Sequence, residues 1–289
     1  MDWITGIQNA INYIENHLTE EIDYDKAAAE AACSSFYFQR IFSILCDISL
    51  SEYIRNRRLT LAGNELNASN AKVIDIALKY GYESPESFAR AFSKFHGITP
   101  SEAKKNGSKL KSFSRLSVKI TMSGGSVMDY KIVEKEAFEI IEKVEAHSIE
   151  NETNSKSIPD FWMRSHNDGT VKALFENATD NTFIFGICYG NNSDSAKTFN
   201  YSIGAICDEN TIVPKGFRKN TIPARTWAIF ECKGAMPKAI QDMWHKITAE
   251  FFPTSGYEPT CEMDIEAYTE GDMGSENYRS EIWIPVVKK

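Results

Sequence analysis

The sequence predicts a multi-domain protein with an all-α N-terminal domain of two tandem helix-turn-helix units and an α+β C-terminal domain. Three observations predict this fold class. Residues recur at an offset of 50, so that Phe38–Ser43 matches Phe88–Ser93. Beyond about residue 107, the helical period gives way to the alternation typical of strands. The order of strands and helices in this second part then repeats once, which predicts two pseudo-symmetric β-α-β-β-type units.

Each copy of the 50-residue repeat is expected to form a helix, a short turn and a second helix. Ser34 or Ser35 is expected to cap the second helix of the first copy. A longer helix from Ser49 or Ser51 joins the two copies, and Gly97 ends the second helix of the second copy. The predicted helices cover residues 5–18, 26–32, 34–45, 49–67, 73–80 and 84–95, and a last short one begins at Thr99.

The C-terminal part contains alternating segments and two helical segments. Strands are expected at residues 116–122, 128–133, 137–144, 182–189, 199–207, 217–222, 224–232, 262–269 and 278–286. Helices are expected at residues 158–176 and 237–252. This order suggests two halves related by a pseudo-two-fold axis, and the interface between such halves is a natural place for a ligand cleft. The expected domains are residues 1–107 and 115–289, with a linker over 108–114.

Charge is distributed unevenly along the chain. The net charge is -8, but residues 1–119 hold 15 Lys and Arg against 14 Asp and Glu, a net of +1. Residues 120–289 hold the other 17 Lys and Arg and the other 26 Asp and Glu, a net of -9. The acidic excess therefore lies outside the repeat. Arg55, Arg57 and Arg58, and a basic run from Lys104 to Lys119, are available for phosphate contacts.

Composition argues against several classes of protein. No run approaches the roughly 20 apolar residues that span a bilayer, and the start of the chain has no export signal, so a cytoplasmic protein is expected. The six cysteines are scattered without a CxxC pair, and no histidine stands at metal-ligand spacing. We expect reduced thiols in or near the cores and no metal or cofactor, with a zinc site or a disulfide as the alternative.

The second helix of each repeat copy presents polar residues opposite its apolar stripe. Arg40 and Arg90 occupy equivalent places. Arginine can pair bidentately with guanine, glutamine with adenine, and a glutamate can accept from cytosine. The alternative is that these residues are only solvated helix positions. Two copies with an equivalent arginine, joined by a long helix, favour binding to duplex DNA.

The stretch Ile76–Ser101 resembles the signature of the AraC/XylS family of bacterial transcription regulators, and the resemblance extends over about residues 5–107. It implies a DNA-binding domain that places two helices in adjacent major grooves. Promoter DNA and RNA polymerase are then the expected macromolecular partners. The base-reading residues implied by the resemblance are Phe36, Gln39, Arg40, Glu86, Ser87 and Arg90.

Carboxylates and aromatic rings share strand faces in the C-terminal part. Period two places Glu266 with Tyr268, and Glu281 with Trp283. A carboxylate among aromatic faces can hold a lipophilic cation through charge pairing and cation–π contact. The alternative is that these are ordinary aromatic strand faces with solvated glutamates.

Two segments, Ile265–Tyr268 and Glu281–Val286, resemble the C-terminal signature of GyrI-like effector-binding domains, and Thr226–Gly234 resembles their middle strand. The resemblance implies tandem α+β units around an amphipathic pocket with an acidic residue, for which Glu281 is the first candidate. A small, amphipathic, cationic or aromatic effector is then the expected ligand. The other candidate ligand-binding residues are Trp283, Tyr268, Glu266, Tyr189, Trp227 and Trp162.

Two other functions stay open for the C-terminal domain. Some domains of the GyrI-like family hydrolyse small electrophiles, and Glu281 or Glu266 could serve as the general acid/base. No nucleophile–base pair is evident among the five histidines, so no enzyme activity is expected. A module that inhibits a partner enzyme or contacts RNA polymerase is the third interpretation.

Overall fold

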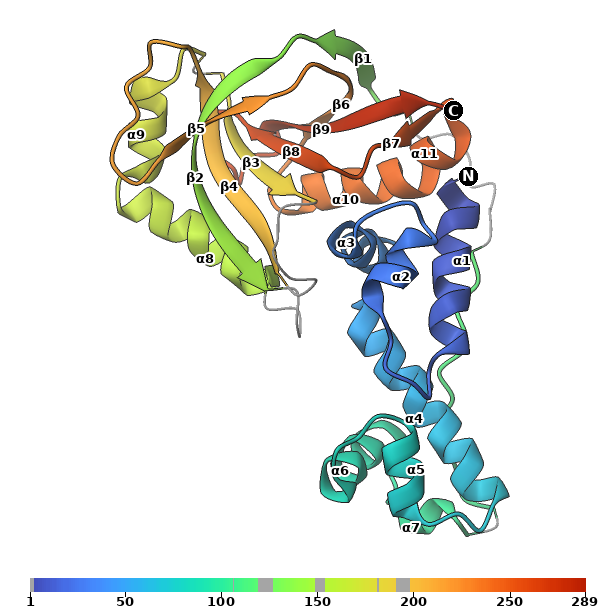
Figure 1. Ribbon diagram of the computed structural model, residues 1–289. Coiled ribbons are helices and arrows are strands. Elements are labelled where there is room, and N and C mark those ends of the chain that lie inside the picture. The colour runs from blue at the N-terminus through green and yellow to red at the C-terminus, as the bar shows by residue number, and fades with distance from the viewer. Residues whose placement is uncertain (1–2, 106, 119–126, 149–153, 181, 191–197) are drawn as a thin grey trace. The chain divides into compact units, whose positions relative to one another are not determined.

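The computed structural model describes residues 3–105, 107–118, 127–148, 154–180, 182–190 and 198–289 (Figure 1). The chain divides into two compact units. The first comprises residues 1–32 and 48–120, and the second comprises residues 33–47 and 121–289. The second helix of the first repeat copy therefore belongs to the same unit as the C-terminal sheet.

The described residues of the first unit form helices and connecting segments but no strand. Its helices are α1 (Trp3–Asn16), α2 (Tyr24–Ala29), α4 (Leu50–Ala68), α5 (Val73–Lys79), α6 (Pro85–His96) and α7 (Pro100–Ala103). All of them were predicted, with boundaries that differ by a few residues. Buried side chains of α4, α5 and α6 form one core, to which Leu66, Ile76, Phe88 and Phe92 contribute.

Local signals explain where α6 begins and ends. The Ser84 hydroxyl accepts a hydrogen bond from the Ser87 backbone N–H at 3.1 Å, and Pro85 starts the first turn. Gly97 ends the helix at a φ of 81°, a left-handed conformation that glycine adopts without strain. The second copy of the repeat is thus defined by residues close to one another in the sequence.

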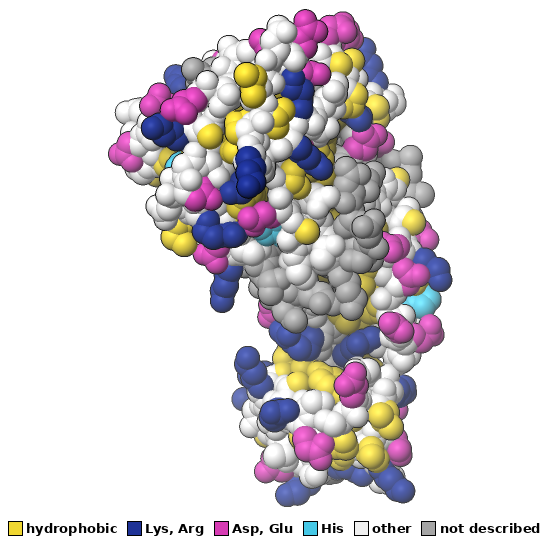
Figure 2. Space-filling view, turned by 60° about the vertical axis from the view of Figure 1, so that its left-hand side comes forward, with side chains coloured by type: hydrophobic (Ala, Val, Ile, Leu, Met, Phe, Trp, Pro, Cys, Tyr) yellow, Lys and Arg dark blue, Asp and Glu magenta, His cyan; other side chains and the backbone are white. Residues whose placement is uncertain are grey.

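Two of the arginines that we expected at phosphates are engaged inside the first unit. Arg57 pairs with the buried carboxylate of Glu15 at 2.8 Å, and Arg58 donates to the carbonyls of Leu18 and Glu20. Arg55 is exposed. On the visible face of the region around α5–α7, basic and acidic side chains are interspersed (Figure 2). The visible face of this region therefore has no extended basic surface, which agrees with the net charge of +1 for residues 1–119.

The second unit is built on an antiparallel sheet. Its strands are β1 (Tyr130–Lys135), β2 (Phe138–Ser148), β3 (Ile184–Tyr189), β4 (Thr198–Cys207), β5 (Arg218–Ile222), β6 (Arg225–Lys233), β7 (Tyr257–Pro259), β8 (Met263–Tyr268) and β9 (Arg279–Lys288). The strand order is β1-β6-β9-β8-β3-β4-β2-β5, and β7 pairs with β9. The order is symmetric about its centre. Each strand of one half has a counterpart at the mirrored place in the order, and the counterparts are β1 and β5, β2 and β6, β3 and β8, and β4 and β9. The predicted pseudo-two-fold fold class is confirmed, with its axis between β3 and β8.

Helices of the second unit cover the sheet. They are α3 (Ser35–Cys46), α8 (Asn154–Asn167), α9 (Thr170–Asn177), α10 (Lys238–Lys246), the π-helical turn η2 (Ile247–Phe251) and α11 (Phe252–Thr254). The single helix expected at 158–176 is two helices, because Gly169 adopts a φ of 83° between them. The helix expected at 237–252 continues through η2 into α11. The sequence did not predict the short strand β7.

Some expectations fall partly outside the described residues. The strand expected at 116–122 is not formed by residues 116–118, and residues 119–126 lie outside the described ranges. No disulfide links any of the six cysteines, all of which are described. None of the helices in the described ranges is both long enough and apolar enough to cross a membrane.

Candidate functional site

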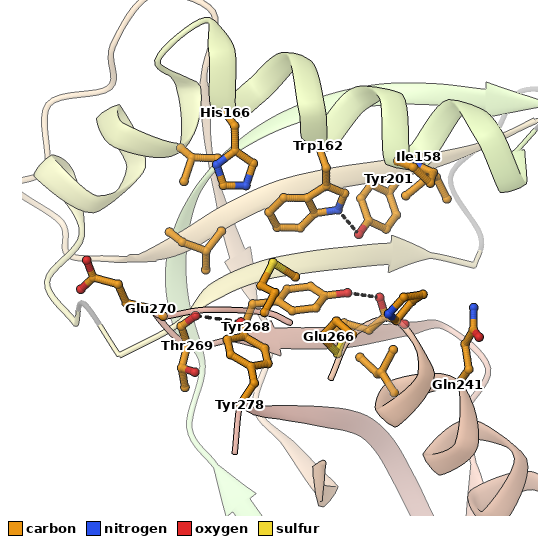
Figure 3. Close-up of a pocket in the computed structure, with 18 of the residues that line it drawn as sticks. Ile158, Trp162, His166, Tyr201, Gln241, Glu266, Tyr268, Thr269, Glu270 and Tyr278 are labelled. Atoms are coloured by element: carbon orange, nitrogen blue, oxygen red, sulfur yellow. Dashed lines mark hydrogen bonds between the residues drawn. The ribbon is translucent and has the colours of Figure 1, made fainter. Parts of the chain in front are cut away.

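A cavity of about 660 Å³ lies in the second unit, at the pseudo-two-fold axis of the sheet. Its floor comes from β3, β4 and β8, and its walls from α8, α9, α10 and the segment before β9. Figure 3 shows side chains from these elements converging on it. The residues that line it include Ile158, Trp162, His166, Phe175, Tyr201, Gln241, Trp244, Glu266, Tyr268, Glu270 and Tyr278. The cavity is where the repeat of strands and helices predicted a cleft.

Glu266 is the interior carboxylate of this cavity. Its side chain is 18% exposed, whereas the other lining carboxylate, Glu270, is an exposed residue. Glu266 Oε1 accepts a hydrogen bond from Trp244 Nε1 at 2.9 Å, and Oε2 accepts one from the Tyr268 hydroxyl at 2.7 Å. Both donors are neutral and orient the carboxylate, and its charged partner is Arg40, whose Nη2 lies 3.4 Å from Oε1. Burial, followed by the charge of Glu266, raises the pKa of Tyr268 well above its usual value, which keeps that hydroxyl protonated.

Aromatic rings form most of the wall opposite Glu266. The Trp162 ring meets the Tyr268 ring edge-on, with centroids 5.2 Å apart. Trp162 Nε1 donates to the Tyr201 hydroxyl at 2.9 Å (Figure 3). A Cβ at Gly186 would collide with that same hydroxyl, so only glycine permits Tyr201 this position. Gly186 is therefore a residue of the site that the sequence analysis did not identify.

The structure divides the predicted ligand-binding residues between the two faces of the sheet. Trp162, Glu266 and Tyr268 line the cavity. Cross-strand partners share a face, and Glu266 pairs with Ile282, so Glu281 and Trp283 project from the opposite face. Among the described lining residues, the cavity includes none of the four other candidates. These are Glu281, Trp283, Trp227 and Tyr189.

The opposite face has polar clusters of its own. Glu281 Oε2 accepts from Trp283 Nε1 at 2.7 Å. The Tyr189 hydroxyl donates to the fully buried Glu142 at 2.5 Å, and Arg218 Nε donates to the same carboxylate at 2.8 Å. Trp227 is fully buried beside the Trp283 ring. Apart from Trp227 Nε1, which has no hydrogen-bond partner among the described residues, these polar groups are satisfied by one another.

The three predicted base-reading residues of the first copy lie on α3, within the second unit. The Arg40 guanidinium is bound to Asp264 and Glu266 of β8. The Phe36 ring stacks on Phe199 of β4 with centroids 3.8 Å apart. The Gln39 side-chain amide donates to Ser35 one turn earlier. The structure therefore brings Phe36 and Arg40 to the sheet.

The three residues of the second copy lie in a different environment. Glu86 and Arg90 are exposed on α6, and Ser87 is partly buried. The Ser87 hydroxyl donates to the Ser84 carbonyl at 2.8 Å. The face of α6 that carries Glu86 and Arg90 is open to solvent, as a groove-reading helix requires.

Asp264 is a buried carboxylate that the sequence analysis did not single out. Its side chain is 1% exposed, and burial raises its pKa to about 6 although the charge of Arg40 opposes the rise. The sequence did contain a pattern that could have identified it, since strand period two places Asp264 on the same face as Glu266 and Tyr268. What the pattern did not contain was the partner, because Arg40 is 224 positions away.

The two parts of the chain match different protein families. Residues 131–286 match the family model of an integron-associated effector binding protein, and residues 27–106 match that of a helix-turn-helix domain. The transcriptional activator AarP of Providencia stuartii is 40% identical over 95 residues, which are 33% of this chain and 70% of AarP. The regulatory protein SoxS of Salmonella typhimurium is 38% identical over 96 residues, 33% of this chain and 90% of SoxS.

A solved structure described as SAV2435 bound to tetraphenylphosphonium is similar to part of this chain. The match covers 55% of this chain and 94% of the solved chain. The sequence identity is 24% and the TM-score is 0.49. With a TM-score below 0.5, this similarity is too weak to bear on the function of the present chain.

A helix-turn-helix domain followed by an effector-binding domain defines a DNA-binding transcription regulator. The chain belongs to the AraC/XylS family of such regulators and carries a GyrI-like, integron-associated type of effector-binding domain. Both resemblances found in the sequence are confirmed. The matched relatives are described as regulators, and the hydrolase interpretation receives no support from them.

Proposed function

We propose that the second unit senses a small amphipathic cation, and that Glu266 is the carboxylate that selects it. The observation that carries this proposal is an interior carboxylate inside a largely aromatic cavity, which accepts from two neutral donors and has the Arg40 guanidinium beside it. In a region of low dielectric, a cation gains most from pairing with such a carboxylate. Trp162, Tyr268 and Trp244 supply faces for cation–π contact.

The size of the cavity supports a ligand site. Its volume of about 660 Å³ falls within the range of roughly 300–1,000 Å³ that is common for sites of drug-sized molecules. A domain that only inhibits another protein needs no such interior space, so the cavity favours a sensor over an interaction module. Nor does the cavity require catalysis, and we propose that the domain binds its ligand without turning it over.

We propose that residues 1–107 act as the DNA-binding domain and residues 115–289 as the effector-binding domain, joined by residues 108–114. The base-reading residues are then those of the two second helices. They are Phe36, Gln39, Arg40, Glu86, Ser87 and Arg90. Promoter DNA is the target, RNA polymerase the further partner, and the cytoplasm the place of action.

Calorimetric titration of the full-length protein tests the ligand proposal. The probes are N-methylacridinium and the similarly shaped, neutral 9-methylacridine at pH 8. The cation is expected to bind more tightly, and Glu266→Gln is expected to weaken it about tenfold, about 1.4 kcal/mol, without affecting the neutral compound. Glu281→Gln is the matched control, because that carboxylate projects from the opposite face. Equal binding of both compounds, or an unchanged affinity in Glu266→Gln, would contradict the proposal.

A separate titration tests DNA binding. Fluorescently labelled fragments from the region upstream of the gene are expected to raise anisotropy at low salt, with an affinity that falls as salt rises. No binding to any of these fragments at low salt would contradict the assignment of the promoter as target.

A further inference from the structure

Arg40 of α3 occupies a site for a guanidinium group on the sheet of the second unit. Its Nη1 contacts Asp264 Oδ2, and its Nη2 lies 3.4 Å from Glu266 Oε1. The guanidinium carbon lies 4.5 Å from the centre of the Trp244 ring. Two carboxylates and an indole face are the chemistry that binds arginine best.

The charges of this site make it a cation site whether or not Arg40 fills it. The Asp264 side chain is 1% exposed, and Oδ1 has no hydrogen-bond partner among the described residues. A buried carboxylate is costly unless a cation compensates it. Burial opposes the charge of Arg40, but Asp264 and Glu266 outweigh that effect and raise the pKa of the guanidinium well above its usual value.

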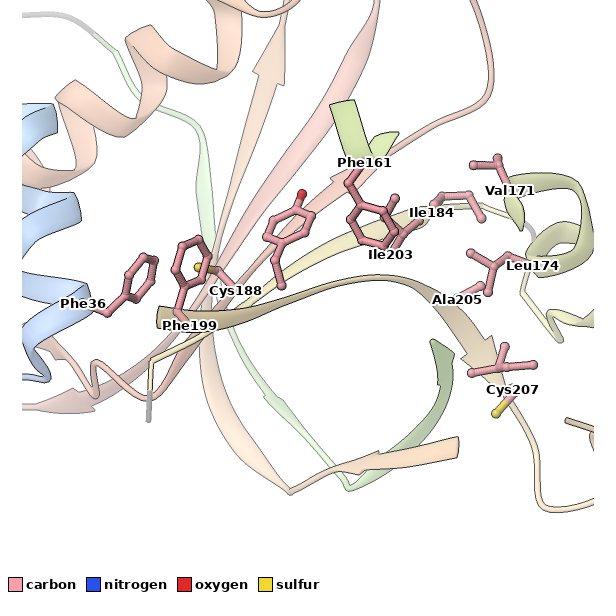
Figure 4. Close-up of a cluster of buried hydrophobic side chains, with 12 residues drawn as sticks. Phe36, Phe161, Val171, Leu174, Ile184, Cys188, Phe199, Ile203, Ala205 and Cys207 are labelled. Atoms are coloured by element: carbon pink, nitrogen blue, oxygen red, sulfur yellow. The ribbon is translucent and has the colours of Figure 1, made fainter. Parts of the chain in front are cut away.

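A second contact anchors α3 one turn before Arg40. Phe36 is 6% exposed and belongs to the same buried cluster as Phe199, Cys188 and Tyr201. Figure 4 shows the Phe36 side chain projecting from α3 toward Phe199. Residues four apart share a helix face, so the face of α3 that carries Phe36 and Arg40 is covered by the sheet. Two of the three predicted base-reading residues of the first copy are thereby withheld from DNA.

We propose that Asp264, Glu266 and Trp244 form an internal guanidinium site, that Arg40 fills it as a resident cation, and that a cationic effector competes with Arg40 for Glu266. This inference rests on the proposed cation-sensing function of the same cavity. It assigns to Arg40 two alternative partners: the sheet in the resting state and DNA once α3 is released.

The competition arises because two groups are shared. Glu266 and Trp244 line the cavity and also contact Arg40. Glu266 Oε1 is the same atom that accepts from Trp244 and lies nearest to Arg40. A ligand cation that pairs with Glu266 shares the negative charge that otherwise pairs with Arg40. It also places a positive charge close to the guanidinium, and both effects weaken the docking of α3.

Linkage makes this coupling reciprocal. The factor by which a bound cation weakens α3 docking equals the factor by which docked α3 weakens cation binding, and couplings of this kind amount to about 5- to 150-fold. Removing Arg40 should therefore tighten the binding of a cation, and adding a cation should loosen α3. The effector is expected to raise affinity for DNA, since release makes Phe36 and Arg40 available to bases.

Titration of the full-length Arg40→Met variant with N-methylacridinium tests the competition. The variant is expected to bind this cation about fivefold more tightly than wild type or better, and to bind 9-methylacridine unchanged. Arg218→Met is the matched control, because Arg218 pairs with the buried Glu142 on the other face of the sheet. Unchanged or weaker binding of the cation by a folded Arg40→Met protein would overturn the inference.

Hydrogen–deuterium exchange on the wild-type protein provides a test that needs no variant. Peptides covering residues 35–46 are expected to exchange faster when N-methylacridinium is added, while peptides of α6 stay unchanged. Slower or unchanged exchange in α3 overturns the inference.

The two proposals fail in distinguishable ways. If neither wild type nor Arg40→Met binds the cation, the proposed function fails. If both bind it equally and α3 exchange does not respond, the cavity is a cation site but Arg40 is not its competitor. Binding by Arg40→Met alone supports both, since Arg40 then blocks the site in wild type.

Discussion

Helices α3 and α6 are two copies of one sequence pattern in two different environments. Each has 12 residues, a serine N-cap that accepts from the backbone three residues on, and a left-handed C-cap residue. Each carries an arginine at the equivalent place. Yet the Arg40 side chain is 18% exposed and bound to carboxylates, whereas Arg90 is an exposed residue.

The clearest chemical difference lies at one repeat position, although the buried Tyr37 of α3 is also replaced, by Ser87. Phe36 in α3 corresponds to Glu86 in α6. A phenylalanine gains free energy when it leaves water for an apolar cluster, and a glutamate loses free energy there. The same capped helix can therefore pack on a sheet in one copy and stay in solvent in the other. The environment of the outward arginine therefore depends on the other residues of its helix face, such as the one a turn earlier.

The largest expected effect comes from truncating that neighbour. Phe36→Ala should destabilise the second unit by about 3–5 kcal/mol, the usual cost of removing a buried phenylalanine. Glu86→Ala, the matched change in the other copy, should stay within about 0.5 kcal/mol. Urea unfolding followed by far-ultraviolet circular dichroism measures both. Similar small effects in the two variants would show that α3 is not packed on the sheet in solution.

The next effect is on DNA affinity without effector. Arg90→Ala should weaken specific binding by about 1–3 kcal/mol, the cost of losing one base contact. Arg40→Ala should cost less than this, because the docked side chain is not available to DNA. Anisotropy titration with one promoter fragment compares the two variants. A larger loss for Arg40→Ala would mean that α3 already reads DNA in the absence of ligand.

A smaller effect should be the same in both copies. Ser34 Oγ accepts from Tyr37 N at 3.2 Å, and Ser84 Oγ accepts from Ser87 N at 3.1 Å. Removing either cap by Ser→Ala should cost about 1 kcal/mol of the free energy of unfolding. Since capping is local, the two values should agree. A much larger loss for Ser34→Ala in urea unfolding would show that tertiary packing, and not the cap, dominates there.

The smallest expected effect is the pH dependence that His96 gives to the α6 copy. Buried His96 accepts from the Lys111 backbone and donates to the Leu59 carbonyl, so it is neutral. Burial lowers its pKa below the usual 6.5. Its contribution to stability is therefore present above pH 6.5 and is lost as pH falls through the lower folded value.

The variant His96→Gln checks this sign. The difference in unfolding free energy between wild type and His96→Gln should narrow as pH falls from 7.5 to 5.5. A difference that widens would contradict the assignment of a neutral buried histidine. Asp264 acts in the opposite direction for α3, because its raised pKa of about 6 makes the folded second unit more stable as pH falls below that value.

Much of the architecture could be predicted, because it depends on short-range patterns. The helices of each repeat copy, the cap at Ser34 or Ser35 and the strand alternation all depend on residues a few positions apart. The order of strands and helices also predicted the pseudo-two-fold sheet, and the observed strand order confirms it. Glu266 and Tyr268 share a face as period two required, and both line the cavity.

Which of the two carboxylates lines the cavity could not be predicted in the same way. Glu266 and Glu281 each stand beside an aromatic residue in an alternating strand. Only the pairing of Glu266 with Ile282 reveals that the two carboxylates project from opposite faces. Register between strands is set by the packing of the whole sheet, and a shift of one residue would exchange the faces.

The sequence by itself determined the family, the two kinds of domain and the elements of each, since periodicity, caps and motifs are properties of neighbouring residues. Only the tertiary structure decided which residues meet. It placed Arg40 against Asp264, 224 positions away, and united Glu266 with Trp244 and Trp162 around one cavity. Such contacts form because burial brings distant apolar surfaces together and charges must then find partners inside. No local pattern contains that information.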